Sequence, residues 1–268
     1  QNDAHLFVTP EQIKSEFKNV VDLIFDVYKD FNITNYRCVL SLRDKEDKEK
    51  YYQDDEMWDK AENELREVLN ELNIDYTEEI GEAAFYGPKL DVNVKPAVGN
   101  EYTLSTCQLD FCLPMKFDLK YVSKDGDKKT PVVLHRAILG SLDRFMAYIL
   151  EETKGALPLW LSPTQINVIP VNNEYHTEYA NKIYELLKDN GFRVNIDLRD
   201  EKLSYKMRES QTKKIPYTLI LGDKEKENNN ISYRCFGNTD TKTIDTHEFI
   251  LLLKEQIRDK KWVTLFFF

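Results

Sequence analysis

The sequence predicts two folded domains of different class. Residues 1–157 are expected to form an α+β domain with a largely antiparallel sheet, because several short strand patterns follow one another there. Residues 158–268 are expected to form an α/β domain with a mixed, mainly parallel sheet, because strand and helix patterns alternate. The glycine- and proline-rich segment 155–163 separates the part with successive strand patterns from the part where strand and helix patterns alternate. A chain of 268 residues is long enough for two domains of ordinary size.

The first domain begins with a strand that ends at residue 8 and leads into a helix. Thr9, Pro10 and Gln12 form a capping pattern with proline at the first helical position, and apolar spacing extends this helix to about residue 30. A charged surface loop over 43–55 precedes a second helix. The further elements predicted in this domain are a helix over 56–73 and strands over 36–42, 76–78, 90–94, 101–113 and 117–122.

The stretch 131–152 is predicted to be an apolar strand that turns through His135 and Arg136 into a helix. At helical spacing, one half is apolar: Ile138, Leu139, Leu142, Phe145, Met146, Ile149 and Leu150. The opposite side carries Ala137, Gly140, Ser141, Arg144 and Tyr148. A glycine within a helix costs about 1 kcal/mol against alanine, so small residues around one arginine favour the close approach of a ligand. The alternative is close packing on a sheet, with Arg144 in a structural ion pair.

The second domain is predicted from alternating strands and helices. The expected strands cover 166–171, 192–197, 217–222 and 231–236, and the expected helices cover 174–190, 204–214 and 245–258. Beyond residue 258 the tail is apolar without a period, so no element is predicted there.

Composition limits the partners and the compartment. The formal net charge is −10 with a pI near 5.1, so a nucleic-acid partner has to be met by a local basic patch. No apolar run has transmembrane length, and no signal peptide is visible. The four cysteines show no CxxC spacing, which favours free thiols in a reducing compartment: Cys38, Cys107, Cys112 and Cys235. We therefore expect a protein of the cytoplasm or an organelle matrix, without a membrane partner.

Two histidines are candidates for a metal site. His5 and His135 each lie at the end of an apolar strand, and two strands of one sheet could bring both imidazoles to one ion. A structural, hydrogen-bonded histidine is the alternative. Cys107 and Cys112 are candidates for a third ligand by residue type alone. The other two histidines are expected on the surface: His176 and His247.

The densest basic cluster follows the strand over 192–197. It comprises Lys206, Arg208, Lys213 and Lys214, as an RNA-contacting patch in an acidic protein would require. The alternative is a solvated helix face that is balanced by the acidic side chains Glu201 and Glu209.

Several motifs, in order along the chain, resemble the threonyl-tRNA synthetase family of class II aminoacyl-tRNA synthetases. HRAILGSLDRF at 135–145 is similar to motif 3 of the class, and QNDAHLF at 1–7 resembles the end of motif 2. The other matching stretches are AAFYGPKLD at 83–91, QLDFCLP at 108–114, LPLWLSPTQ at 157–165 and GDKE at 222–225. The resemblance implies a partial class II catalytic core over 1–157 and an anticodon-binding domain over 158–268.

The resemblance also implies chemistry. The family is a threonine–tRNA ligase: threonine and ATP, with Mg²⁺, give threonyl-adenylate, and the threonyl group then passes to its tRNA. Zinc held by one cysteine and two histidines tests for threonine, and His5 and His135 match those histidines. Arg144 matches the motif 3 arginine that holds ATP. Asp3 matches the acid that meets the substrate hydroxyl, and the remaining positions that match the pocket are Tyr86, Lys89, Gln108, Gly140 and Ser141.

In the second domain the resemblance places base-reading residues at Asp200, Lys214, Glu225 and Arg234, where Asp200 and Lys214 replace the expected Asn and Arg. In the strand TLSTCQ, Thr103 and Leu104 replace the expected Gln and Cys, so we expect that wall of the pocket to differ.

The resemblance further implies segments that the sequence does not include. Motif 1 with its homodimer interface, the arginine of motif 2, the cysteine ligand and an editing domain are expected upstream of Gln1 in a full-length protein. We expect the isolated chain to be inactive. The alternative function is a non-catalytic accessory protein that binds tRNA or other RNA with a fold derived from a synthetase.

Overall fold

The computed structural model describes residues 1–262 and divides the chain into two compact units. The first unit spans Gln1–Glu152 and the second Thr153–Phe268. The prediction that the apolar tail forms no element lies, from residue 263 onward, outside the described residues.

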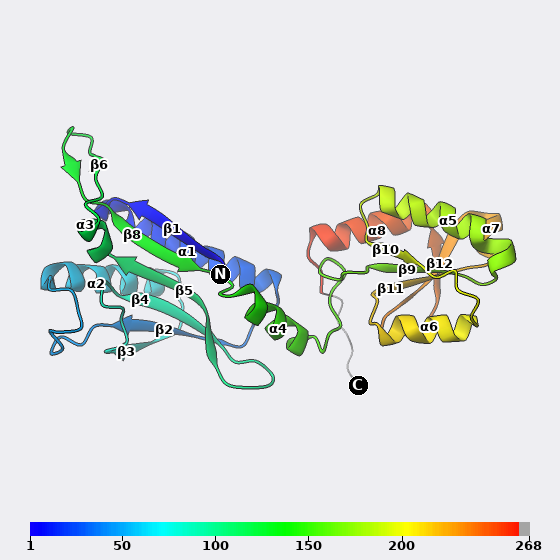
Figure 1. Cartoon of the computed structure of the whole chain (residues 1–268), viewed down its shortest axis with the longest axis horizontal. Coiled ribbons are helices and arrows are strands. Elements are labelled where there is room, and N and C mark those ends of the chain that lie inside the picture. The colour runs from blue at the N-terminus through cyan, green and yellow to red at the C-terminus, as the bar shows by residue number, and fades with distance from the viewer. Residues whose placement is uncertain (263–268) are drawn as a thin grey trace. The chain divides into compact units, whose positions relative to one another are not determined.

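A six-stranded sheet forms the centre of the first unit (Figure 1). Its strand order is β1-β8-β5-β4-β2-β3, and every neighbouring pair is antiparallel except β2 and β3. The largely antiparallel sheet is therefore confirmed. Its strands are β1 (Asp3–Val8), β2 (Tyr36–Leu42), β3 (Tyr76–Ile80), β4 (Lys89–Val94), β5 (Tyr102–Asp110) and β8 (Val132–Ala137).

Two long helices cover one face of this sheet (Figure 1). The short 3-10 turn η1 (Pro10–Gln12) leads into α1 (Ile13–Asp30), and the Gln12 side chain accepts a hydrogen bond from the Thr9 backbone at 2.9 Å, as the capping pattern predicts. α2 (Asp55–Glu71) begins at Asp54, whose side chain accepts from the Met57 backbone. Tyr28 and Trp58 are fully buried beneath the sheet, so the opposite face is the one available for a site.

Two predicted strands differ in the structure. The strand expected over 101–113 ends at Asp110, where α3 (Cys112–Lys116) begins because the Asp110 carboxylate accepts from two backbone N–H groups of its first turn. The strand expected over 117–122 shrinks to β6 (Tyr121–Val122), which pairs only with β7 (Lys128–Lys129) in a separate hairpin. Both predictions were based on local apolar runs, which do not show that Asp110 caps a helix at the end of β5.

The helix predicted within 131–152 begins later than expected. β8 continues to Ala137, a turn follows, and α4 (Leu142–Glu152) starts only after Gly140, which has φ +57°. The buried side of α4 is Phe145, Tyr148 and Ile149. The predicted apolar half is therefore wrong in part, because Leu142, Met146 and Leu150 are exposed.

The second unit is a five-stranded mixed sheet of order β10-β9-β11-β12-β13. The pairs β10–β9 and β9–β11 are parallel, and the other two pairs are antiparallel, so the sheet is mixed as predicted but not mainly parallel. α5 and α8 cover one face and α6 the other (Figure 1). The bounds are β9 (Ile166–Pro170), α5 (Asn173–Asp189), β10 (Val194–Ile196), α6 (Leu203–Thr212), β11 (Tyr217–Leu221), α7 (Asp223–Asn228), β12 (Asn230–Cys235), β13 (Lys242–Asp245) and α8 (Thr246–Arg258).

Two short elements of this unit escaped prediction, namely α7 and β13. α7 has only six residues and no buried ones, so it carries no apolar period. Within residues 1–262, the helices are all too short or too polar to cross a bilayer.

Candidate functional site

A cavity of about 580 Å³ lies on the sheet face of the first unit that faces away from α1. Strand alternation explains its composition, because His135 pairs directly with Gln108 on β5 and with His5 on β1, so these side chains share one face. The lining residues are Gln1, Asp3, Tyr86, Tyr102, Thr103, Leu104, Thr106, Gln108, His135, Ala137, Gly140, Ser141 and Arg144. Seven of the nine site residues predicted for this domain thus line the cavity, and the other two, Lys89 and His5, do not.

A β-bulge shapes one wall of the cavity. Val92 of β4 pairs with Ser105, whereas its neighbour Asn93 pairs with Thr103, so Leu104 is the extra residue. The bulge lets Thr103 and Leu104, which are consecutive, both reach the cavity, although simple alternation places them on opposite faces.

The turn at Gly140 closes the same wall. A Cβ at this position would lie 3.0 Å from the Leu104 carbonyl oxygen, and its positive φ also disfavours a side chain. Asn2, which sequence reasoning missed, holds the turn: its side chain accepts from the backbone of Ile138 and Leu139, and its N–H donates to the Gly140 carbonyl at 2.9 Å. Only long-range pairing of β1 with β8 brings Asn2 here, so no local signal could have revealed it.

Polar side chains on the cavity floor are linked to one another. The Tyr86 hydroxyl donates to the Gln108 side-chain oxygen, and the Gln108 amide donates to Thr106 at 3.1 Å. Burial, reinforced by nearby carboxylates, raises the pKa of Tyr86, so it stays a neutral donor. Lys89 instead forms an ion pair with Asp91 at 2.5 Å, beside the cavity.

Arg144 stands exposed at the cavity edge, in the first turn of α4. Within residues 1–262 its guanidinium forms no ion pair, which contradicts the alternative of a structural one. Tyr102, another residue that sequence reasoning missed, lines the same cavity, and burial raises its pKa. An unpaired guanidinium next to an aromatic side chain suits a phosphate and a planar base.

His5 and His135 face each other across β1 and β8. Their Nδ1 atoms are 2.8 Å apart, and the rings meet edge to face. Cys107 neighbours Gln108 on β5 and so points to the other face, where burial raises the pKa of its thiol. Cys112 is buried in α3. No group of three or more potential ligands is found among residues 1–262, so neither cysteine completes a metal site.

The predicted basic cluster does not form one patch. Lys206 is almost fully buried and donates to the Asp197 carbonyl at 3.1 Å. Lys213 pairs with Glu209 at 2.9 Å, and Lys214 donates to the Lys154 carbonyl. Period and charge along the sequence could not reveal that α6 turns Lys206 toward the sheet.

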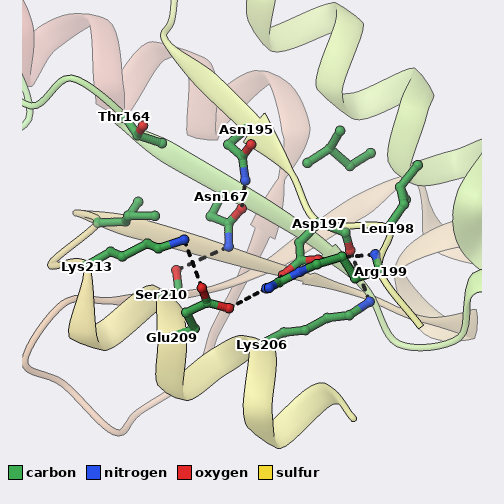
Figure 2. Close-up of a pocket in the computed structure, with 12 residues that line it drawn as sticks. Thr164, Asn167, Asn195, Asp197, Leu198, Arg199, Lys206, Glu209, Ser210 and Lys213 are labelled. Carbon is green, nitrogen blue, oxygen red and sulfur yellow. Dashed lines mark hydrogen bonds and ion pairs between the residues drawn. The ribbon is translucent and has the colours of Figure 1, made fainter. Parts of the chain in front are cut away.

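Lys206 and Lys213 line a second cavity, of about 420 Å³, between α6 and β10 (Figure 2). Arg199 is bound to Asp197 at 2.6 Å and to Glu209 across the opening. These hydrogen bonds from Arg199 lower the pKa of Asp197. A chain of amides and hydroxyls crosses the floor, from Asn195 to Asn167 to Ser210 (Figure 2). The charges of this wall are thus paired internally.

The four predicted base-reading residues lie at separate places in the second unit. Asp200 is exposed before α6, and Lys214 follows α6, so a helix of ten residues, about 15 Å long, separates them. Glu225 accepts from Gly222 N at 2.9 Å and Ser232 Oγ at 2.6 Å. Although burial alone would raise it, these hydrogen bonds hold the pKa of Glu225 below its ordinary value.

Arg234 lines a shallow groove against α6. Its Nη2 donates to Thr241 at 3.1 Å, whereas its buried Nε has no partner within residues 1–262. The predicted surface position of His176 is wrong: it is 3% exposed, accepts from Asn172 N and contacts Asp223 at 2.9 Å. His247 is exposed, as predicted.

A largely antiparallel sheet with a cavity on its open face, followed by a separate mixed α/β unit, is the architecture expected of a class II aminoacyl-tRNA synthetase, and the family comparisons agree. The "tRNA synthetase class II core domain (G, H, P, S and T)" matches residues 1–153, and the "Anticodon binding domain" matches residues 165–256. The chain belongs to this class II family, and the predicted fold class is confirmed.

Within the class, the chain is similar to threonine–tRNA ligases, which confirms the resemblance found in the motifs. The enzyme of Staphylococcus carnosus is 56% identical over 97% of the chain, and that of Staphylococcus saprophyticus is 57% identical over the same share. The chain spans 40% of the length of each.

Solved structures agree with these relatives. The RNA binding domain of threonyl-tRNA synthetase from Cryptosporidium parvum superimposes with a TM-score of 0.87 at 36% identity, covering 95% of this chain and 63% of that one. A putative threonyl-tRNA synthetase from Aeropyrum pernix gives a TM-score of 0.80 at 28% identity, covering 97% and 63%.

Proposed function

We propose that a protein carrying this chain is a threonine–tRNA ligase, which activates threonine with ATP and transfers it to its tRNA. The observation that carries the proposal is the single cavity that gathers Asp3, Gln108, His135 and Arg144 from three strands and a helix. Because the chain spans 40% of its relatives' length, the activity is proposed for the protein that joins it to their remaining segments.

In this proposal the cavity works by placing reactants and neutralising charge. The substrate carboxylate attacks the α-phosphate of ATP, so no side chain has to act as a nucleophile. Arg144, which has no carboxylate partner within residues 1–262, binds the γ-phosphate and stacks on adenine, and Mg²⁺ neutralises the phosphates. Gly140 and Ser141 leave room for the nucleotide because they carry no large side chain.

Threonine is placed on the opposite side of the cavity. Tyr86 and Gln108, which are hydrogen-bonded to each other, orient the threonine. Asp3 binds the threonine hydroxyl. Lys89 lies beside the pocket in an ion pair with Asp91. A hydroxyl that is held by polar groups excludes valine strongly, because valine would leave those groups unpaired.

His5 and His135 fit two positions of a zinc site. Tetrahedral bonds of about 2.0–2.1 Å place two ligating nitrogens roughly 3.4 Å apart, so the 2.8 Å between the two Nδ1 atoms needs only a small opening. The resemblance implies a cysteine from a preceding segment as the third ligand. Bound there, zinc would supply a Lewis-acid contact to the amino group and hydroxyl of threonine.

The second unit would bind the anticodon. Asp200, Glu225 and Arg234 present charged groups of both signs, and Lys214 adds a cation farther along. Unstacked bases are read by hydrogen bonds to their edges and by stacking. The family resemblance implies a homodimer of the full-length protein, which we include in the proposal.

Threonine-dependent ATP–pyrophosphate exchange tests the proposal in a protein of relatives' length that contains this chain. Arg144→Ala is expected to lower exchange by about 10²–10³-fold, as loss of a group that stabilises transition-state charge does. Arg208→Ala, which removes an exposed arginine of the second unit, is the matched control and should retain exchange. No exchange in the unmodified protein, together with retained tRNA binding, would favour the accessory RNA-binding function instead. Robust exchange by the Arg144→Ala protein would contradict the role of Arg144.

A further inference from the structure

Asp110 is a fully buried carboxylate whose two oxygens have different partners. It is the last residue of β5 and is 0% exposed. Oδ1 accepts from the backbone N–H groups of Cys112 at 2.9 Å and Leu113 at 2.8 Å, which caps α3. Oδ2 lies 2.8 Å from Nε2 of His135. Capping needs only the first oxygen, so the second contact calls for its own explanation.

The contact at Oδ2 decides where the imidazole of His135 carries its proton. An ionised carboxylate only accepts hydrogen bonds, so Nε2 of His135 has to be the donor. A neutral imidazole then has its lone pair on the other nitrogen, Nδ1. That atom lies 2.8 Å from Nδ1 of His5, which therefore donates to it when no ion separates the two rings.

We propose that Asp110 is a positioning residue: it holds His135 as the Nε2–H tautomer, so that the Nδ1 lone pair points at His5 and is free to bind a transition-metal ion. The tautomer follows from contacts within this chain, whereas its use in metal binding rests on the zinc site of the proposed function. A metal-ligating histidine commonly donates its second N–H to a carboxylate, which fixes both the tautomer and the ring orientation.

The fold makes this contact specific. Gln108 pairs with His135 in the β5–β8 register, and Asp110, two residues on, lies on the same face. Capping of α3 fixes the rotation of the carboxylate, because turning it would leave two backbone donors unsatisfied in a buried place. The backbone of β5 and the first turn of α3 thus fix the Asp110 carboxylate, and this carboxylate sets which nitrogen of His135 on β8 carries the proton.

Asp110→Asn separates the tautomer from the cap. The amide oxygen can still accept from Cys112 and Leu113, while the amide nitrogen then faces Nε2 of His135 and donates to it. The ring must move its proton to Nδ1, which removes the lone pair from the side of His5. Asp91→Asn is the matched control, since Asp91 is also buried, lies on the neighbouring strand β4 and contacts Lys89 and Thr106 but no histidine.

The first measurement is the ¹⁵N NMR spectrum of the histidine-labelled, metal-free 268-residue chain at pH 8. We expect an unprotonated Nδ1 for His135 in the wild-type chain and in Asp91→Asn, and a protonated Nδ1 in Asp110→Asn. A wild-type His135 that carries its proton on Nδ1 overturns the proposal, even if the variant fails to fold. An unchanged tautomer in a folded Asp110→Asn chain overturns it as well.

The second measurement is Zn²⁺ affinity of the same chains by calorimetric titration. Asp110→Asn is expected to weaken Zn²⁺ binding by about 10–100-fold, as loss of such a carboxylate partner does, and Asp91→Asn is expected to leave it unchanged. Equal affinities in a variant with the inverted tautomer overturn the metal-binding part. If a protein of the relatives' length that contains this chain binds no Zn²⁺, the zinc site of the proposed function fails, while the NMR result still decides whether Asp110 sets the tautomer.

Discussion

The two units arrange their candidate residues in opposite ways. In the first unit, residues from β1, β5, β8 and α4 converge on one cavity and are bound to one another, as Tyr86 is to Gln108. In the second unit, Asp200 and Lys214 lie at the two ends of α6, and Glu225 is bound to the start of its own helix and to β12. An enclosed site suits a small substrate, whereas a distributed surface suits an extended RNA. Coupling between residues should therefore be strong in the first unit and weak in the second.

The largest effect is expected from Gly140→Ala. Its Cβ would meet the Leu104 carbonyl at 3.0 Å and would occupy a positive φ; together these should lower the free energy of unfolding of the first unit by about 2–3 kcal/mol. Gly126→Ala is the control, because its φ is also positive but nothing lies within 4 Å of the added atom, so only the backbone cost of about 1 kcal/mol remains. Denaturant unfolding measures both, and equal losses would show that the turn at Gly140 is not tightly packed.

Double-mutant cycles test the contrast itself. Tyr86→Phe and Gln108→Ala remove two ends of one hydrogen bond, so their effects on binding of a threonyl-adenylate analogue should fall short of additivity by about 0.5–3 kcal/mol. Asp200→Ala and Lys214→Ala are separated by the length of α6, so their effects on tRNA affinity should add within about 0.5 kcal/mol. Strong coupling in the second pair would break the comparison.

A smaller effect is expected from the ion pairs of the second unit. Hydrogen bonds from Arg199 lower the pKa of Asp197 below its ordinary 3.8. A carboxyl whose pKa is lower in the folded state stabilises the fold above its unfolded value and loses that contribution as pH falls through the folded value. Asp197→Asn should therefore reduce the thermal midpoint of the second unit at pH 7, and the difference should shrink as the pH falls below 3.8 and Asp197 becomes protonated in the folded state. A difference that does not shrink with falling pH would assign the loss to packing.

Sequence reasoning found the parts of the site that follow from periodicity or motif. The motifs correctly brought Gln108, Gly140 and Arg144 to one cavity, and the two strand-end histidines do meet. It missed Asn2 and Tyr102, because their places depend on strand pairing and on a bulge, which are set by long-range contacts. It also extended the helix before Gly140, since helical spacing fits residues that in fact form a strand end and a turn.

In the second unit, too, long-range contacts that the sequence pattern does not show decide where some side chains lie. Its strands and long helices follow from alternating apolar patterns, but the burial of Lys206 and His176 does not, because charge and type alone indicate solvent exposure. Each is satisfied by a partner distant in sequence or across a loop, Asp197 for Lys206 and Asp223 for His176.

The central claim is that the cavity of the first unit recognises threonine joined to an adenine nucleotide. Calorimetric titration of a protein of the relatives' length that contains this chain, with non-hydrolysable threonyl- and valyl-adenylate analogues, tests it most directly. We predict saturable binding of the threonyl analogue, at least about tenfold weaker binding of the valyl analogue, and a loss of affinity in Arg144→Ala but not in Arg208→Ala. Equal binding of both analogues, or an Arg144→Ala chain that binds as tightly as the wild type, would contradict the account.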